Sequence, residues 1–365
     1  MRDRITFLTY KPLDKALLLN VLKKSNVSDV EEKNILEIIL NNFSKNDYTL
    51  ITPQENLFLN LHSHELWAQY LIYRYKFTTL PEQRLVTDFP TYLLIEPVSA
   101  CNLRCIMCFQ VDETFTKSQE FMGKMDLNLF YKIIDEATAG GTKALTLASR
   151  GEPTLHPQLG DMLGYCKEKF FELKINTNAT RLDEKLIHKI LQSGVTEIVF
   201  SIDSYEKGEY ESIRVKGIFE EVLNNIIKFK DIRDGEYPDS KCVTRVSGVK
   251  VNKEQDATKF KEFWEKYVDH VVMVEMQNRW DTYHNPKEIA GSGSCKLLWE
   301  RMYIWYDGIC NPCDVDYKSE LQVGSIKENS IKDIWTGEKY QKLRKTHLDG
   351  NRNSCYPCDR CPISD

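Results

Sequence analysis

The 365-residue chain is predicted to be an α/β protein: a partial (β/α)6 TIM-like barrel, with a mainly helical extension before it and a cysteine-rich domain after it. Three observations predict this. From about residue 90, short apolar runs alternate with amphipathic helical patterns, which is typical of a parallel sheet. Earlier residues show mainly helical spacing. Nine of the eleven cysteines fall in two clusters, one beside the first apolar run and one near the C-terminal end.

The N-terminal extension has apolar residues at helical spacing in residues 13–22, 30–43 and 66–75. Residues 49–61 between them look more extended. No chemical motif stands out in this part of the chain. We expect it either to pack against the main domain or to form a small peptide-binding module.

The barrel is expected to contain six strands with helices between them. The strands are expected at residues 92–96, 143–148, 172–176, 197–202, 244–250 and 270–276, and the helices at about 126–138, 156–169, 183–193, 218–231 and 254–267. In such barrels ligands bind at the carboxyl ends of the strands.

Polar clusters follow three of these strands at that end. They are Ser149-Arg-Gly151-Glu152, Asn176-Thr-Asn178 and Ser201-Ile-Asp203-Ser204. A glycine admits close backbone approach, a carboxylate accepts hydrogen bonds from an ammonium group, and Asn, Ser and Asp suit ribose hydroxyls. Each cluster alone could be a turn or a helix cap, but together they favour a nucleoside-like ligand.

Three cysteines follow the first apolar run in a C-x3-C-x2-C spacing. They are Cys101, Cys105 and Cys108. Three thiolates on one loop can hold three irons of a cubane iron–sulfur cluster, whose usual ligand set is four, so that the fourth iron stays open. A structural zinc site normally has four ligands, and no nearby His or Cys completes one. This loop therefore predicts an iron–sulfur cluster.

The cysteine loop and the polar clusters resemble those of the radical S-adenosylmethionine (radical SAM) superfamily. The resemblance implies a [4Fe-4S] cluster on the three cysteines that reduces SAM to give a 5′-deoxyadenosyl radical, which takes a hydrogen atom from a substrate. Gly151-Glu152-Pro153 is similar to the motif that holds the SAM amino group, although Arg150 replaces its first glycine. The resemblance also implies SAM contacts at Met107 (adenine), at Asn178, Ser201 and Asp203 (ribose and carboxylate) and at Arg214 (carboxylate).

Six further cysteines lie near the C-terminal end: Cys295, Cys310, Cys313, Cys355, Cys358 and Cys361. Alone they would fit a zinc ribbon or an iron–sulfur site equally well. The segment resembles the auxiliary-cluster domains called SPASM and twitch, which implies one auxiliary [4Fe-4S] cluster. Its expected ligands are Cys295, Cys313, Cys355 and Cys358. Cys310 and Cys361 are left over, and Cys166 and Cys242 are expected to be structural.

The expected domains are residues 1–88 (helical extension), 89–285 (radical SAM partial barrel) and 286–365 (SPASM/twitch domain).

An auxiliary cluster can accept the second electron when a substrate radical becomes an oxidised product. The resemblance is strongest to dehydrogenases of sugar or carbocyclic alcohols, which implies a substrate contact at Arg279. The alternatives are a peptide maturase, a radical epimerase with Cys310 as hydrogen donor, and a non-catalytic iron–sulfur carrier. The intact SAM-site residues speak against the carrier.

The composition argues against two classes of binding partner. The net charge of −5 and the pI near 5.9 argue against nucleic acid and against an anionic membrane. No apolar run is long enough to span a bilayer, and the N-terminal residues lack the features of a signal peptide. We therefore expect a cytoplasmic enzyme with a flavodoxin- or ferredoxin-type electron donor, acting on a carbohydrate-like small molecule or a peptide. Cysteines in such a protein are more often metal-bound than paired.

Overall fold

The structure, a computed structural model, describes residues 12–277 and 281–363. Backbone contacts divide the chain into two compact units, Leu8–Thr87 and a larger one that contains Asp88–Asp365. The larger unit therefore holds both the barrel and the cysteine-rich segment after it. No helix in the described part of the chain combines the length and the apolar character needed to cross a membrane.

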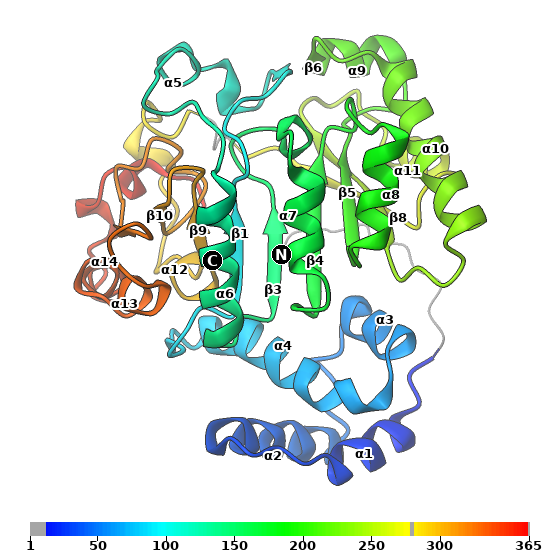
Figure 1. Cartoon of the computed structure of the whole chain (residues 1–365). Coiled ribbons are helices and arrows are strands. Elements are labelled where there is room, and N and C mark those ends of the chain that lie inside the picture. Colours follow the sequence, from blue (N-terminus) through cyan, green and yellow to red (C-terminus); the bar gives the residue numbers. More distant parts are fainter. Residues whose placement is uncertain (1–11, 278–280, 364–365) are drawn as a thin grey trace. The chain divides into compact units, whose positions relative to one another are not determined.

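The described part of the smaller unit, from residue 12 on, contains four α-helices (Figure 1). They are α1 (Lys15–Lys24), α2 (Val30–Ser44), α3 (Pro53–Leu61) and α4 (Trp67–Glu82). The extended conformation expected for residues 49–61 is wrong over α3. Thr52 and Glu55 cap this helix reciprocally, with Pro53 at its first position, and this combination starts a helix firmly. Glu55 is also buried in an ion pair with Arg74.

The barrel in the larger unit has the six parallel strands expected from the sequence, which confirms the fold class. They are β1 (Tyr92–Ile95), β3 (Ala144–Leu147), β4 (Glu172–Thr177), β5 (Glu197–Ser201), β7 (Val243–Lys250) and β8 (His270–Glu275). Each pairs in parallel with the next in this order. Their carboxyl ends therefore lie along the same edge of the sheet.

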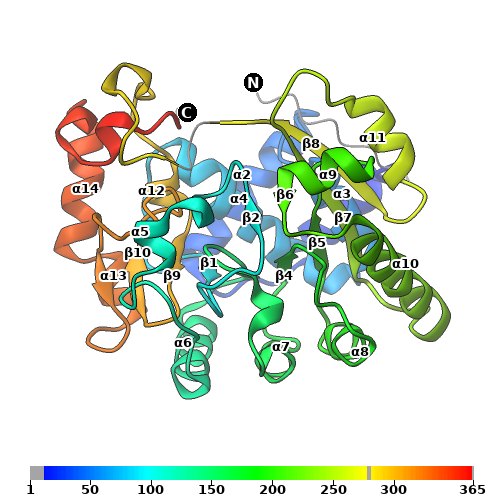
Figure 2. The same ribbon diagram turned by 90° about the horizontal axis from the view of Figure 1, so that it is seen from above.

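Five helices cover the outer face of this curved sheet (Figure 2). They are α6 (Leu127–Gly140), α7 (Leu159–Cys166), α8 (Glu184–Gln192), α10 (Phe219–Glu236) and α11 (Ala257–Trp264). Their inward-facing apolar residues are buried, as in α6, where Phe130, Ile133 and Ile134 have no exposed surface. The inner face and the strand ends are left for a ligand.

The cysteine-rich segment continues the barrel sheet beyond β1. Strand β9 (Met302–Ile304) pairs in parallel with β1, and β10 (Ile309–Asn311) and β11 (Gly324–Ser325) follow in antiparallel pairing. The helices α13 (Ile331–Trp335) and α14 (Glu338–Leu348) complete this region. The sheet thus has nine strands, and β1 lies inside it, between β3 and β9.

Candidate functional site

The loop after β1 carries the first three cysteines. Two-residue strand β2 (Arg104–Cys105) pairs with β6 (Arg214–Val215), which places Cys105 opposite Arg214. This pairing holds the loop against the segment that follows β5. Cys101 and Cys108 are partly buried and Cys105 is buried.

Hydrogen-bond donors from other segments reach these sulfur atoms. Nη1 of Arg214 lies 3.8 Å from Sγ of Cys105, and Nδ2 of Asn178 lies 3.8 Å from Sγ of Cys101. The amide N–H of Leu103 donates to the same sulfur over 3.4 Å. Such donors favour the thiolate, which is the form that binds a metal.

The donor set of this loop, three thiols, suits an iron–sulfur cubane. Burial raises the pKa of Cys101 to about 11 and that of Cys108 to about 12, but coordination to a metal deprotonates a thiol. Among the described residues, no three His, Cys, Asp or Glu side chains are spaced around a single metal ion. Thiolates that each bind a different iron of a cubane stand further apart, and three of them leave one iron free for another ligand.

Glu152 fixes the loop that follows β3. Its Oε1 accepts hydrogen bonds from the hydroxyls of Thr154 and Thr177, each over 2.6 Å. Its Oε2 accepts from the amide N–H of Asn178 over 2.7 Å. Burial raises the pKa of Glu152, and these hydrogen bonds oppose the shift. The chain's own donors thus satisfy the carboxylate, which ties the loop after β3 to the end of β4.

Gly151 lies where the loop after β3 meets the cysteine loop. A side-chain carbon at this position would overlap the carbonyl oxygens of Val98 and Ala100. The amide N–H of Glu152 donates to the same carbonyl of Ala100 over 3.0 Å. Only glycine permits so close an approach, so Gly151 allows the two loops to lie together.

Asp203 and Arg214 form a buried ion pair at the same edge. Oδ2 of Asp203 lies 2.7 Å from Nε of Arg214, and their side chains are 0% and 9% exposed. Burial lowers the pKa of Arg214, but Asp203 and the thiol of Cys105 raise it by more, so the arginine stays charged. Asp203 therefore anchors Arg214 beside the cysteine loop, and Arg214 is no surface residue.

The remaining predicted SAM contacts also belong to this edge of the sheet. Ser201 ends β5 and is partly buried, and Met107 is a partly buried member of the cysteine loop. Arg279 lies outside the described residues. The structure therefore brings together, around the cysteine loop, most of the residues singled out from the sequence: Gly151, Glu152, Asn178, Ser201, Asp203 and Arg214.

Arg150, which replaces the expected glycine, forms a buried ion pair with Glu96. Its Nε and Nη2 lie 2.7 and 2.6 Å from the two carboxylate oxygens, and the two side chains are 2% and 0% exposed. Nη1 donates to the carbonyl oxygen of Tyr317 over 2.9 Å. The guanidinium also lies 4.3 Å from the ring of Trp305. Arg150 thus ties the end of β1 to the cysteine-rich segment.

A second link joins the residues after Cys108 to those after Cys313. The rings of Phe109 and Tyr317 are stacked, with centroids 4.7 Å apart. The hydroxyl of Tyr317 donates to Asp112 over 2.8 Å, and Nζ of Lys318 lies 2.7 Å from the same carboxylate. The two cysteine groups are therefore connected by packed side chains within one unit.

The second group of cysteines gathers around Cys361. Cys361 is 8% exposed and packs with Val315 and Ile363, and Cys295 and Cys313 pack against this cluster. Burial, Asp316 and the thiols of Cys358 and Cys361 raise the pKa of Cys313 well above its ordinary value. We call Cys295, Cys313, Cys358 and Cys361 the auxiliary cysteine group.

Cys355 lies at the margin of this group. Burial raises the pKa of Cys355. Asp359 raises it further, whereas Ser354 and Lys342 lower it. For Cys358, the leading influences after burial are Cys361 and Cys295, ahead of Cys355. The ligand set expected from the sequence contained Cys355 and left out Cys361. In the structure Cys361 packs with Cys295 and Cys313, and the choice between Cys355 and Cys361 stays a prediction.

Cys310 is enclosed within β10. It has no exposed surface, and its Sγ lies 3.8 Å from the carbonyl oxygen of Gly308. Burial and the carboxylates of Asp307 and Glu136 raise its pKa. A hydrogen donor to a substrate radical must be reachable by the substrate, so this position does not support Cys310 in that role. Cys166 and Cys242 are also buried, in α7 and directly before β7.

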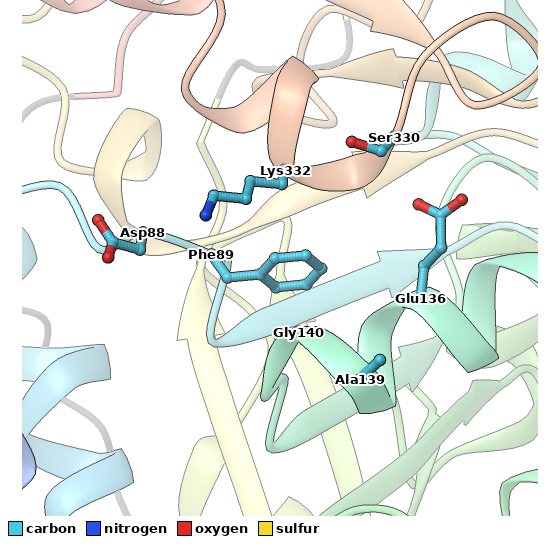
Figure 3. Close-up of a pocket in the computed structure, with 7 residues that line it drawn as sticks. All are labelled: Asp88, Phe89, Glu136, Ala139, Gly140, Ser330 and Lys332. Atoms are coloured by element: carbon cyan, nitrogen blue, oxygen red, sulfur yellow. The ribbon is translucent and has the colours of Figure 1, made fainter. Parts of the chain in front are cut away.

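A cavity of about 480 Å³ lies at the other end of β1, away from the cysteine loop (Figure 3). It is lined by Asp88, Phe89, Glu136, Ala139, Gly140, Ser330 and Lys332. Asp88 and Phe89 come just before β1 starts, and Gly140 ends α6. The cavity is therefore separate from the candidate site.

Sequence reasoning missed two buried glutamines that join loops at the strand ends. Gln110 is 2% exposed, and its Nε2 donates to the carbonyl oxygens of Ser99 and Arg150. Nε2 of Gln255 donates to the carbonyl oxygen of Asp203 over 2.6 Å. The one sequence signal for a role of Gln110 was its position two residues after Cys108. Nothing near Gln255 in the sequence indicated its role.

Two family models match the chain, in the order of its two main regions. Residues 95–263 match the radical SAM superfamily. Residues 295–362 match SPASM, an iron–sulfur cluster-binding domain. The first match contains the cysteine loop and the barrel strands β3, β4, β5 and β7, and the second contains the auxiliary cysteine group.

The chain is also similar to individual proteins. It is 26% identical over 321 residues to the tungsten-containing aldehyde ferredoxin oxidoreductase cofactor-modifying protein of Pyrococcus furiosus, covering 75% of this chain and 88% of that one. It is 22% identical over 276 residues to the S-adenosyl-L-methionine-dependent 2-deoxy-scyllo-inosamine dehydrogenase of Niallia circulans, covering 73% and 90%. A solved structure of Streptococcus suis SuiB bound to the precursor peptide SuiA has the same fold, with a TM-score of 0.54, 15% identity and coverage of 100% and 95%.

Proposed function

We propose, from the premise that this chain belongs to the radical SAM superfamily and carries a C-terminal SPASM domain, that it oxidises a hydroxyl group on a small molecule. The substrate class we propose is a sugar, an aminocyclitol or a nucleotide-sugar. The enzyme's cofactors are SAM and iron–sulfur clusters, and when bound they supply a 5′-deoxyadenosyl radical that takes a hydrogen atom from the substrate. The observation that carries the proposal is the packed connection between two cysteine groups in one unit.

At the first site, we assign Cys101, Cys105 and Cys108 as the cluster ligands and the strand-end residues as the SAM-binding surface. Arg214 is charged and anchored by Asp203, so it offers a fixed cation to the SAM carboxylate. Glu152 holds its loop in place through three hydrogen-bond partners. We infer that this loop meets the SAM amino group mainly through backbone carbonyls, because the carboxylate of Glu152 is already occupied.

At the second site, we assign the auxiliary cysteine group as the ligands of one auxiliary [4Fe-4S] cluster. Four thiolates close the shell of a cubane. No iron then remains open for substrate, so the role left for this site is electron transfer. Cys355, which the sequence favoured, is the alternative to Cys361.

Oxidation follows from the count of electrons. A hydroxyl-bearing carbon that has lost a hydrogen atom becomes a ketone when its hydroxyl proton and one more electron leave. The stack of Phe109 on Tyr317 begins next to Cys108 and ends four residues after Cys313. This gives the second electron a short packed route from the first site toward the auxiliary cysteine group. We propose a flavodoxin- or ferredoxin-type protein as the external electron donor.

The names of the two sequence relatives given above support a small-molecule substrate. One is a cofactor-modifying protein and the other is a dehydrogenase of an aminocyclitol. Peptide maturation is the second candidate. The fold neighbour SuiB, seen with a precursor peptide, has a chain long enough to match the whole of this one, so a role in peptide binding for the helical unit α1–α4 deserves a direct test.

The deciding experiment is the mass of the product formed in deuterated water. Oxidation predicts a product two mass units lighter than the substrate, with one SAM consumed per product. Epimerisation would give an isomer that carries a solvent deuteron at carbon, and this outcome would overturn the proposal. Peptide maturation would be indicated instead if the enzyme cleaved SAM productively only with a precursor peptide and not with sugars or aminocyclitols.

A further inference from the structure

Arg352 is a buried cation beside the auxiliary cysteine group. Only 4% of the surface of this residue is exposed. Nη2 donates to the carbonyl oxygen of Cys361 over 3.0 Å, and Nε donates to the carbonyl oxygen of Cys358 over 3.3 Å. The guanidinium is thus fixed by the backbone of the same segment that supplies two of the thiols.

The third nitrogen of this guanidinium has no partner in the described part of the chain. Nη1 of Arg352 is buried and makes no hydrogen bond with any described residue. Its charge acts on the thiols of Cys295 and Cys358, whose pKa values burial raises and the arginine lowers. A buried N–H donor without an acceptor is costly, so an acceptor is expected at this position.

A second unpartnered donor lies close by, on His347. The amide N–H of Cys295 donates to Nδ1 of His347 over 3.3 Å, so the proton of the neutral ring is on Nε2. That Nε2 is buried and has no partner among the described residues either. Two buried donors, on Arg352 and His347, are therefore left without an acceptor among the described residues near the auxiliary cysteine group.

We propose that Arg352 is a positioning residue for the auxiliary cluster: its Nη1 donates a hydrogen bond to a cluster sulfur, and its charge raises the reduction potential of that cluster, with His347 as a second donor. This inference rests on the proposed function, in which the auxiliary cysteine group accepts an electron. The sulfurs of an iron–sulfur cluster accept hydrogen bonds, and such bonds and nearby charge set its potential.

The direction of the effect follows from charge. Reduction adds one negative charge to a cluster that four thiolates already make negative. A fixed cation beside it stabilises the reduced state more than the oxidised state. Among the described residues no carboxylate forms an ion pair with Arg352, so its charge is not cancelled locally. The proposed acceptor would then take an electron more readily than a cluster without this arginine.

The experiment measures the reduction potential of the auxiliary cluster by EPR-monitored redox titration, in a chain whose first site has been removed by replacing Cys101, Cys105 and Cys108 with Ala. Arg352→Gln is expected to disfavour the reduced state at least tenfold, which lowers the potential by about 59 mV for one electron. Arg352→Lys keeps the charge and is expected to restore most of the shift.

Arg344→Gln is the matched control. Arg344 is 1% exposed and also has one unpartnered nitrogen. Its guanidinium, however, lies over the rings of Trp335 and Tyr340. Burial lowers its pKa with Tyr340 opposing the shift, and no cysteine is among the influences. This variant is expected to leave the potential unchanged. Iron content shows whether each variant holds its cluster.

A wild-type measurement decides the case if Arg352→Gln fails to hold a cluster. Protein labelled with 15N in arginine side chains is expected to show, in pulsed EPR of the reduced auxiliary cluster, a coupling to a guanidinium nitrogen. A missing coupling, or an unchanged potential in a fully loaded Arg352→Gln chain, would overturn this inference alone. A wild-type chain that binds only about four irons would instead overturn the proposed function as well.

Discussion

The two cysteine groups are built in different ways. Cys101, Cys105 and Cys108 lie on one loop eight residues long, and the strand ends around it supply the rest of the site. The auxiliary cysteine group draws its thiols from three separate parts of the C-terminal region, each held by its own packing. The first group is thus defined by local spacing, and the second exists only when the region has folded.

The arginines beside the two cysteine groups differ in how far their charge is compensated. Arg214 is paired with the carboxylate of Asp203, so much of its charge is compensated. Arg352 is held by backbone carbonyls, which carry no net charge. An uncompensated buried cation exerts the stronger field. We therefore expect the auxiliary cluster to have a higher reduction potential than the first cluster. This order suits an auxiliary cluster that accepts an electron.

The largest effect on the two cysteine groups is expected when Cys101, Cys105 and Cys108 are replaced together by Ala. The anaerobically loaded wild type is expected to hold about eight irons and this variant about four. Cleavage of SAM should be abolished, because the iron that binds SAM is lost. Iron analysis and chromatography of 5′-deoxyadenosine measure both effects. Continued formation of 5′-deoxyadenosine by the variant would contradict the assignment.

Cys361→Ala and Cys355→Ala form a matched pair that sharpens the picture of the second group. Cys361→Ala is expected to lose about four irons and to stop product formation while SAM cleavage persists at some level. Cys355→Ala should keep its iron, because Cys355 lies at the margin of the group. If Cys355→Ala loses the iron and Cys361→Ala does not, the ligand set expected from the sequence was right.

The link between the two regions can be weakened through Arg150. Arg150→Met fills similar space but leaves the carboxylate of Glu96 buried without its partner. Removing one member of a buried ion pair costs about 3–5 kcal/mol, to be read from anaerobic urea denaturation. The exposed pair of Lys207 and Glu220 provides the control, since Lys207→Ala should leave the midpoint unchanged. Equal midpoints for both variants would show that the buried pair does not join the regions.

The smallest effect is expected at Tyr317. Tyr317→Phe keeps the ring that stacks on Phe109 but removes the hydrogen bond to Asp112, at a cost of about 1 kcal/mol in the same denaturation experiment. The ratio of product to 5′-deoxyadenosine should not change. Tyr317→Leu also removes the ring, and here the ratio is expected to fall. A normal ratio in Tyr317→Leu would exclude the stack as the route of the second electron.

The sequence was informative where patterns are local. The six barrel strands are apolar runs with clear limits, and the cysteine loop is a compact motif, so both were predicted. The choice between Cys355 and Cys361 stays a prediction, because linear spacing fits Cys355-x2-Cys358 and Cys358-x2-Cys361 equally well. Helix α3 was missed although its start has a local signal, the cap Thr52 followed by Pro53 and Glu55.

Longer-range features had no sequence signal. Strands β9, β10 and β11 have two or three residues each, which is too short for a visible alternation of apolar and polar residues. The pair of Arg150 with Glu96 joins two loops 54 residues apart. Arg352 stands among polar residues in the sequence, and nothing there indicates that it is buried.

The pairing of β9 with β1 has a consequence for how the protein is made. All four residues of β1 are buried, and one edge of this strand stays unpaired until residues 302–304 have left the ribosome. An open edge on an apolar strand invites pairing with other chains. The strand that leads into the cysteine loop therefore gains its second neighbour only late in synthesis. A chain shortened to the barrel is expected to aggregate through this open edge.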